Sequence, residues 1–173
     1  VPIYEPGLEP LFRTVLANGT LTVTTDLAAA VKTAEVVFLA LPTPQGADGA
    51  ADLSSVLAVA DQLGGLLAGF TVVVTKSTVP VGTGDEVAKR IRRTATAVFA
   101  VASNPEFLRE GLAVEDCLHP DRIVIGTSSE PARALLHKLY APVVERESQF
   151  VDMNVRSAEL TKYAANSFLA MKV

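Results

Sequence analysis

Residues 97–111 read AVFAVASNPEFLREG, where an unbroken apolar run, Ala97–Ala102, changes into a polar turn. The apolar run predicts a short strand buried on both faces, because no polar residue interrupts it. We expect Asn104 to cap a following helix and Pro105 to occupy its first position, which these residue types favour. Glu106 and Glu110 are four residues apart and would share one face of that helix.

These two carboxylates have two interpretations. At the end of a strand, beside a helix N-terminus, they suit acid–base chemistry or the binding of a sugar hydroxyl. Alternatively, Glu106 offsets the positive end of the helix dipole and Glu110 is simply solvated. Residues 97–111 by themselves are compatible with both.

The same pattern of strand, turn and helix recurs along the chain. Apolar runs predict further strands at residues 36–41, 70–75, 123–126 and 150–152, and a Thr-rich run predicts one at 20–24. Helical patterns fall at residues 4–18, 26–33, 53–67, 82–93, 130–140 and 157–173, with Asp26 as an expected N-cap. Strands that alternate with helices of this length are typical of an α/β fold with a doubly wound, mostly parallel sheet.

Composition restricts the class of protein. At 173 residues, 49% hydrophobic and 20% charged, the chain is long and apolar enough for a globular domain with its own core. Its net charge of -4, without a basic run, predicts neither a nucleic-acid partner nor an anionic membrane partner. No apolar run approaches the ~18 residues of a membrane span. The single cysteine, Cys117, excludes an internal disulfide and favours a reducing compartment, so we expect a cytoplasmic protein.

Three proline-containing loops follow predicted parallel strands. They are Pro42-Thr43-Pro44, the segment KSTVP at residues 76–80, and Asn104-Pro105-Glu106. In open α/β sheets, ligands bind outside the carboxyl ends of the strands. The hydroxyls of Thr43 and Thr78 can bind a ribose or a phosphate there, or can act as ordinary caps. Three polar loops at one edge favour a shared site.

The C-terminal helical segment adds a fourth element. Lys162 and Asn166 are four residues apart and face the same way, so an amine and an amide could together stabilise an oxyanion. The alternative is a solvated lysine and a neutral asparagine. Cys117 and His119 are too few ligands for a zinc site, so we expect no metal and assign Cys117 no chemistry.

Six segments occur in order along the chain: YEPGL (4–8), PTP (42–44), KSTVPVGT (76–83), NPEFLREG (104–111), PDRIVIG (120–126) and ELTKYAAN (159–166). Together they resemble the UDP-glucose/GDP-mannose dehydrogenase family across nearly the whole chain. The resemblance implies a Rossmann-like fold and NAD-dependent oxidation of the C6 alcohol of a nucleotide sugar to a carboxylate. The expected substrate is UDP-glucose, with GDP-mannose or another nucleotide sugar as the alternative.

The resemblance also implies roles for individual residues. Thr43, Thr78 and Glu110 would lie near NAD, and Thr78 would also hold a catalytic water. Glu106 would act in acid–base chemistry, in hydrolysis of a covalent thioester. Lys162 and Asn166 would hold the reacting oxygen. The sugar nucleotide would be lined by Glu106, Phe107, Leu108, Arg109, Glu110, Lys162 and Asn166.

The sequence departs from the family pattern at two points. It lacks the G-x-G-x-x-G turn that seats a pyrophosphate, and it lacks a nucleophilic cysteine beyond the Lys162–Asn166 helix. The chain begins at Val1 without Met, so it resembles an internal piece that we expect to be inactive alone. Residues 1–153 would be the second part of an NAD-binding domain, and residues 154–173 the start of a long central helix through which the whole protein forms a homodimer.

A non-catalytic binding or assembly module is the alternative from another class. The presence of Thr78, Glu106, Lys162 and Asn166 together argues against it, because a module without catalysis need not keep all four.

Overall fold

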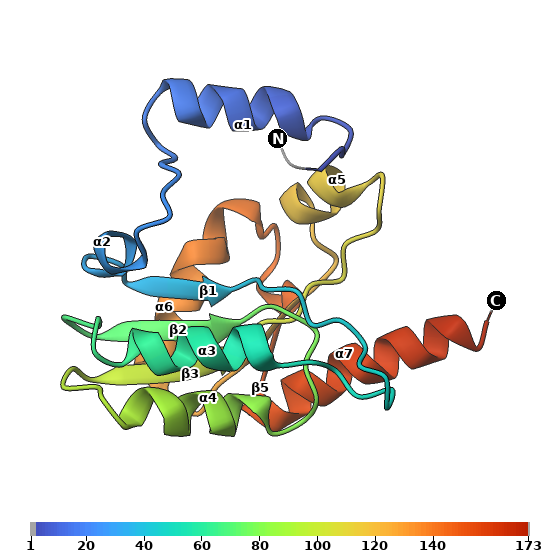
Figure 1. Ribbon diagram of the computed structural model, residues 1–173. Coiled ribbons are helices and arrows are strands. Elements are labelled where there is room, and N and C mark those ends of the chain that lie inside the picture. The colour runs from blue at the N-terminus through green and yellow to red at the C-terminus, as the bar shows by residue number, and fades with distance from the viewer. Residues whose placement is uncertain (1–2, 173) are drawn as a thin grey trace.

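A computed structural model describes residues 3–172, and within them five strands form one sheet in the order β1-β2-β3-β4-β5. Strands β1 (Val36–Leu39), β2 (Thr71–Thr75) and β3 (Phe99–Ser103) run parallel (Figure 1). Strand β4 (Ile123–Gly126) meets β3 antiparallel, with Ser103 opposite Gly126, and runs parallel to β5 (Phe150–Met153). The start of β4 therefore lies at the sheet edge where β1, β2 and β3 end. The expected mostly parallel α/β sheet is confirmed.

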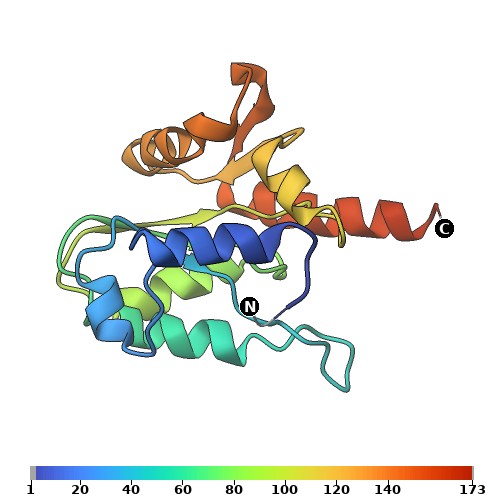
Figure 2. The ribbon, with the colours of Figure 1, turned by 90° about the horizontal axis from the view of Figure 1, so that it is seen from above.

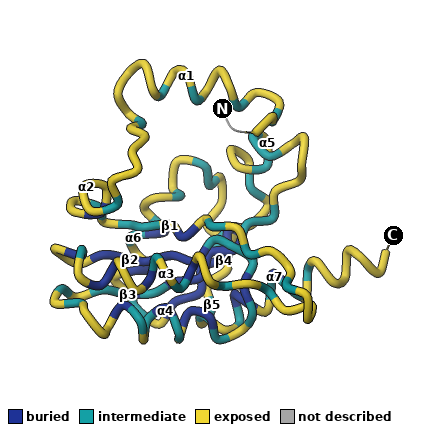
Figure 3. The backbone as a smooth tube through the Cα atoms, in the orientation of Figure 1, coloured by how far each residue is buried: buried dark blue, intermediate teal, exposed yellow. Residues whose placement is uncertain are grey.

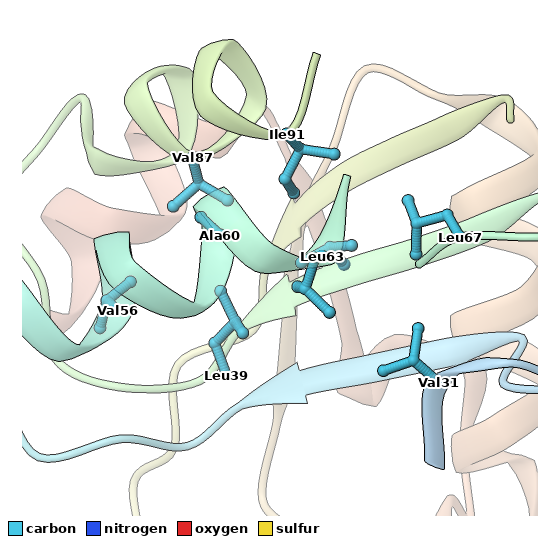
Figure 4. Packing of buried hydrophobic residues seen from close by; sticks show 9 residues of the cluster. Val31, Leu39, Val56, Ala60, Leu63, Leu67, Val87 and Ile91 are labelled. Carbon is cyan, nitrogen blue, oxygen red and sulfur yellow. The ribbon is translucent and has the colours of Figure 1, made fainter. Parts of the chain in front are cut away.

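Helices cover both faces of this sheet. On one face, α2 (Leu27–Val31), α3 (Ser54–Leu63) and α4 (Thr83–Arg92) pack on alternate side chains of β1 and β2 (Figure 4). On the other face, α6 (Glu130–Tyr140) packs on β2, β3 and β4 (Figure 2). Every residue of β2 is buried, because this strand lies between the two layers. Each fully buried valine contributes about 1.5–3 kcal/mol of hydrophobic stabilisation.

Helix starts follow the local sequence. The Asp26 carboxylate accepts a hydrogen bond from Ala29 N–H at 3.0 Å and caps α2, as predicted. The Ser129 hydroxyl oxygen accepts one from Ala132 N–H at 3.4 Å, and Pro131 fits the first turn of α6. Helix α6 is followed by two short 3-10 segments, Ala141–Val143 and Glu147–Gln149.

Helix α7 (Val155–Ala170) begins at Asn154, whose side chain accepts a hydrogen bond from Ser157 N–H at 2.9 Å. It packs against β3 and β4 and then extends beyond the sheet (Figure 2). Phe168, Leu169 and Met171 near its end are exposed. The expected continuation to residue 173 lies outside the described residues.

Helix α1 (Leu8–Ala17) confirms the expected N-terminal helix but has no buried residue, and it stands apart from the sheet (Figure 3). The expected strand at residues 20–24 is wrong. These residues connect α1 to α2 and pair with no strand, and local hydrogen bonds involve the two ends of the segment. Leu21 N–H donates to Val15 O at 2.9 Å, and Asp26 N–H donates to Thr24 Oγ1 at 3.0 Å.

The helix expected to begin at Asn104 is also wrong. Asn104 N–H donates to Thr75 O at 2.9 Å and so extends the ladder between β2 and β3, and residues 104–109 follow as an irregular connection. Glu106 and Glu110 therefore share no helix face. The next helix is α5 (Ala113–Leu118), which the sequence patterns did not indicate. No helix within residues 3–172 has the length and apolar content that crossing a membrane requires.

Candidate active site

A cavity of about 570 Å³ opens at the sheet edge where β2 and β3 end and β4 begins. Its walls come from the connection after β3, from α5, from the approach to β4 and from α7. Of the residues expected to bind the sugar nucleotide, it brings together Glu106, Phe107, Leu108, Arg109, Lys162 and Asn166. Glu110 is exposed and does not line it.

Asn104 is the buried centre of the cavity floor, with 2% of its surface exposed. Its Nδ2 donates to Val124 O at 2.8 Å, which joins β3 to β4. Its Oδ1 accepts hydrogen bonds from the Tyr140 hydroxyl and from Lys76 Nζ, the latter at 3.2 Å. The side chain expected to cap a helix instead holds two functional groups in the cavity wall, one from the residue after β2 and one from α6.

Glu106 and Lys162 form an ion pair at the cavity edge. Lys162 Nζ donates to Glu106 Oε1 at 2.9 Å and to the main-chain oxygen of Glu106 at 2.6 Å. Leu108 N–H donates to the other carboxylate oxygen at 2.7 Å. Burial alone would raise the pKa of Glu106, but the hydrogen bonds from Lys162 and Leu108 outweigh it, so the pKa is lowered. The carboxylate is ionised at neutral pH and can accept a proton.

Lys162 has only 8% of its surface exposed, so the interpretation of it as a solvated lysine is wrong. Burying an ammonium requires a partner, and the two Glu106 oxygens supply it. Asn166 lies one turn further along α7 and lines the same cavity, as the four-residue spacing predicts.

Sequence reasoning missed Lys76 and Tyr140. Burial lowers the pKa of the Lys76 ammonium, and nearby Lys162 lowers it further, while Cys117 and Glu106 oppose this shift. Burial raises the pKa of Tyr140 to about 12, so its phenol stays protonated and remains a hydrogen-bond donor. A lysine directly after a fully buried strand was the available sequence signal for Lys76. Tyr140 carried no comparable signal, because it ends an ordinary amphipathic helix.

Two cations flank the ring of Phe107. The Arg122 guanidinium lies 4.3 Å from the ring centroid and Lys162 Nζ lies 5.4 Å from it. Such cation–π contacts hold an aromatic face in one orientation. Arg122, which precedes β4, was also missed by sequence reasoning.

The turn at residues 109–113 is fastened from two sides. Arg109 pairs with Asp116 of α5 at 2.6 Å, so its guanidinium is already occupied by a carboxylate. The Glu5 carboxylate accepts hydrogen bonds from Gly111 N–H at 3.1 Å and from Ala113 N–H at 2.8 Å. Glu5 thus caps α5 from the other end of the chain, which a local pattern cannot indicate.

The loops after β1 and β2 are joined to each other. Thr43 Oγ1 donates to the main-chain oxygen of Thr78 at 2.9 Å. Ser77 Oγ accepts from Leu41 N–H at 2.8 Å and donates to Leu41 O at 2.6 Å. Thr43, Thr78 and Glu106 therefore lie at the same edge of the sheet, as predicted, although the two threonines lie outside the cavity itself.

The Thr43 and Thr78 hydroxyls fit the binding of a dinucleotide. Hydroxyl groups after neighbouring parallel strands lie where α/β folds bind nicotinamide cofactors. Among residues 3–172, no group of three or more His, Cys, Asp and Glu side chains is arranged to hold a metal ion.

Fold and site together define an NAD-binding dehydrogenase domain. Residues 1–144 match the NAD binding domain of the UDP-glucose/GDP-mannose dehydrogenase family. The chain belongs to this family, and NAD is its cofactor.

Relatives resemble the chain over its whole length. A UDP-glucose 6-dehydrogenase of Rhizobium meliloti is 52% identical, and one of Pseudomonas aeruginosa is 51% identical, each over 100% of this chain. A solved UDP-glucose dehydrogenase from the hyperthermophilic archaeon Pyrobaculum islandicum has a TM-score of 0.93 at 44% identity, over 99% of this chain and 40% of that one. A GDP-mannose dehydrogenase from Pseudomonas aeruginosa has a TM-score of 0.92 at 34% identity, with the same coverage. The chain spans 39% and 40% of the lengths of the Pseudomonas and Rhizobium relatives.

Proposed function

We propose that this chain is part of a UDP-glucose 6-dehydrogenase, whose whole protein oxidises the C6 alcohol of UDP-glucose to the carboxylate of UDP-glucuronate. The ion pair between Lys162 and Glu106 carries the proposal, because it places an ionised base and a buried ammonium against one cavity. The names of the relatives that match over the whole chain support UDP-glucose as the substrate.

Lys162 and Asn166 hold the reacting oxygen in this proposal. As the alcohol is oxidised and later as water attacks the thioester, negative charge develops on that oxygen. The Lys162 ammonium, already oriented by Glu106, and the Asn166 amide stabilise this charge. Lys162 is held by Glu106 and needs little rearrangement to turn a proton toward the substrate.

Glu106 acts as the general base for the hydrolytic step. Its carboxylate is ionised at neutral pH and can take a proton from water, and its lowered pKa makes it a weaker base than a free glutamate. Thr78 holds that water through its hydroxyl, and Thr43 keeps the Thr78 loop in place through its hydrogen bond to the Thr78 main-chain oxygen. Thr43, Thr78 and Glu110 would hold NAD, which would supply the hydride acceptor.

The organisation of the whole protein forms part of the proposal. Residues 1–153 form the later part of the NAD-binding domain, and residues 154–173 begin a central helix that pairs two subunits into a homodimer. The exposed apolar side chains Leu160, Phe168 and Met171 on α7 support that pairing. We place the enzyme in the cytoplasm, without a nucleic-acid partner, where UDP-glucuronate would serve polysaccharide biosynthesis. The chain alone is inactive, because it lacks a G-x-G-x-x-G turn and the nucleophilic cysteine.

NADH absorbance tests the proposal. The full-length protein is incubated with NAD and either UDP-glucose or GDP-mannose, and we expect two NADH per UDP-glucose and little turnover of GDP-mannose. A preference for GDP-mannose would identify GDP-mannose as the substrate in place of UDP-glucose. No NADH from any nucleotide sugar would favour a non-catalytic binding module.

A further inference from the structure

Glu159 is a buried carboxylate to which the proposed reaction gives no role. Only 2% of its surface is exposed, and it lies on α7 one turn before Lys162. Its Oε2 accepts a hydrogen bond from Gly82 N–H and its Oε1 accepts one from Gly84 N–H, both at 2.7 Å. These two bonds join α7 to the first turn of α4, 75 to 77 residues away in sequence.

These hydrogen bonds are donated by main-chain N–H groups at the start of α4, which have no partner within the helix. Gly82 is the N-cap of α4 with a φ of 98°, and no side chain of the α4 segment caps it. A carboxylate at this position also faces the positive end of the helix dipole. Both oxygens are used, which suits the ionised form. The pKa of Glu159 is nevertheless raised, because burial, helped by neighbouring Asp85, outweighs the two N–H groups and Arg156, which lower it.

The joined segments carry the proposed active-site groups. Gly82 ends the connection from β2 that contains Thr78, so Glu159 fixes the far end of that connection. Lys162 is three residues further along α7, on the same helix face, and its ammonium binds Glu106 after β3. One face of α7 therefore fixes the loops after β2 and β3 relative to each other.

The packing around Glu159 leaves α7 little freedom to shift. A Cβ on Gly84 would lie 2.5 Å from Val155 Cγ1 and 3.2 Å from Glu159 Oε1. A Cβ on Gly126 would lie 2.4 Å from Ala158 Cβ. Helix α7 therefore packs directly against α4 and β4. The hydrogen bonds of the Glu159 carboxylate fix the position of α7 along that contact.

We propose that Glu159 is a positioning residue, which acts through α7 to hold the Lys162 ammonium on Glu106 and to align both with the Thr78 loop. This inference rests on the roles proposed above for Lys162 and Glu106. Glu159 itself touches neither substrate nor cofactor. Misplacing a reacting group by about 1 Å can cost roughly 100-fold in rate, so loss of the anchor should lower kcat strongly.

A double-mutant cycle in the full-length protein tests this role. Glu159→Gln keeps the size of the side chain but turns an NH2 group toward a backbone donor, so one anchor is lost. We expect kcat for UDP-glucose to fall about 10- to 100-fold, with KM within about twofold. On a Lys162→Met background the same change should cost less than about threefold, because the group that it positions is absent. Glu159→Asp, which keeps the charge but reaches only one N–H, should give a smaller loss in the same direction.

Val87→Ala is the matched control. Val87 is fully buried in α4, and its side chain forms no hydrogen bond with Glu159 or Glu106. It should lower Tm and reduce kcat by the same factor on both backgrounds. Equal losses from Glu159→Gln on both backgrounds would overturn the proposal and leave Glu159 a stability residue.

Hydrogen exchange separates this proposal from the proposed function. Leu108 N–H is held by Glu106 Oε2, so Glu159→Gln should speed its exchange together with that of Gly82 and Gly84. Faster exchange at the glycines alone would contradict the positioning role. If the wild-type protein oxidises no nucleotide sugar, the proposed function fails, and exchange at Leu108 still decides the role of Glu159.

Discussion

Lys162 Nζ lies 2.9 Å from Glu106 Oε1, although 56 residues separate the two in sequence. The contact exists because α7 packs across β3 and β4 and so brings its buried face to the end of β3. A base that follows β3 and a cation on α7 are thereby held at one cavity.

Glu106→Gln tests the basicity of the Glu106 side chain apart from its hydrogen bonding. Gln keeps an oxygen for the Lys162 ammonium but cannot accept a proton from water. In the full-length enzyme we expect steady-state turnover to fall about 10²- to 10⁴-fold, the usual cost of losing a general base. A first burst of NADH should remain, and mass spectrometry should find a covalent adduct on a cysteine outside this chain. A wild-type rate with no adduct would return Glu106 to a structural role.

The lowered pKa of Glu106 predicts how stability depends on pH. A carboxyl whose pKa is lower in the folded than in the unfolded state stabilises the fold above its unfolded pKa, about 4.3, and loses that contribution as pH falls through the folded value. Urea unfolding of wild type and Glu106→Gln should therefore differ most near pH 7 and converge below about pH 4. A difference that grows toward acid pH would contradict the lowered pKa.

Tyr140→Phe removes the hydroxyl that donates to Asn104 Oδ1. Loss of this hydrogen bond, together with the 3.5 Å one that the hydroxyl accepts from Lys76 Nζ, should lower the free energy of unfolding by at least about 0.5–1.5 kcal/mol, measured by urea denaturation. Tyr4→Phe is the control, because Tyr4 is 91% exposed and its change should be neutral. Equal changes in the free energy of unfolding for the two substitutions would mean that the Tyr140 hydroxyl does not stabilise the fold.

Gly126→Ala tests the close seating of α7 on β4. The added methyl would lie 2.4 Å from Ala158 Cβ, and we expect a loss of about 1–3 kcal/mol from overpacking. Ala158→Gly in the same chain should recover part of this loss by removing the opposing methyl. Gly65→Ala, which would meet nothing within 4 Å, serves as control. A Gly126→Ala protein as stable as wild type would mean that α7 can move away from the sheet.

Local patterns were sufficient where a segment's own residues determine where it begins and ends. The bounds of α6 and β4 agree with the predicted 130–140 and 123–126, since capping residues and an unbroken apolar run define them. The run at residues 20–24 failed because strand formation needs a partner strand, which a Thr-rich composition cannot supply. Asn104 failed as a helix cap because its side chain binds Val124, Lys76 and Tyr140, all distant in sequence.

The sequence by itself determined the alternation of strands and helices, the sheet edge that carries Thr43, Thr78 and Glu106, and the shared helix face of Lys162 and Asn166. These follow from periodicity and from the rule that parallel strands end at one edge. Only the tertiary structure decided which charges pair. Glu106 binds Lys162 rather than facing Glu110, Glu5 caps α5, and Glu159 caps α4. The physical reason is that a buried charge takes whichever opposite charge or free N–H group packing brings within reach, and that reach is set by the fold rather than by spacing along the chain.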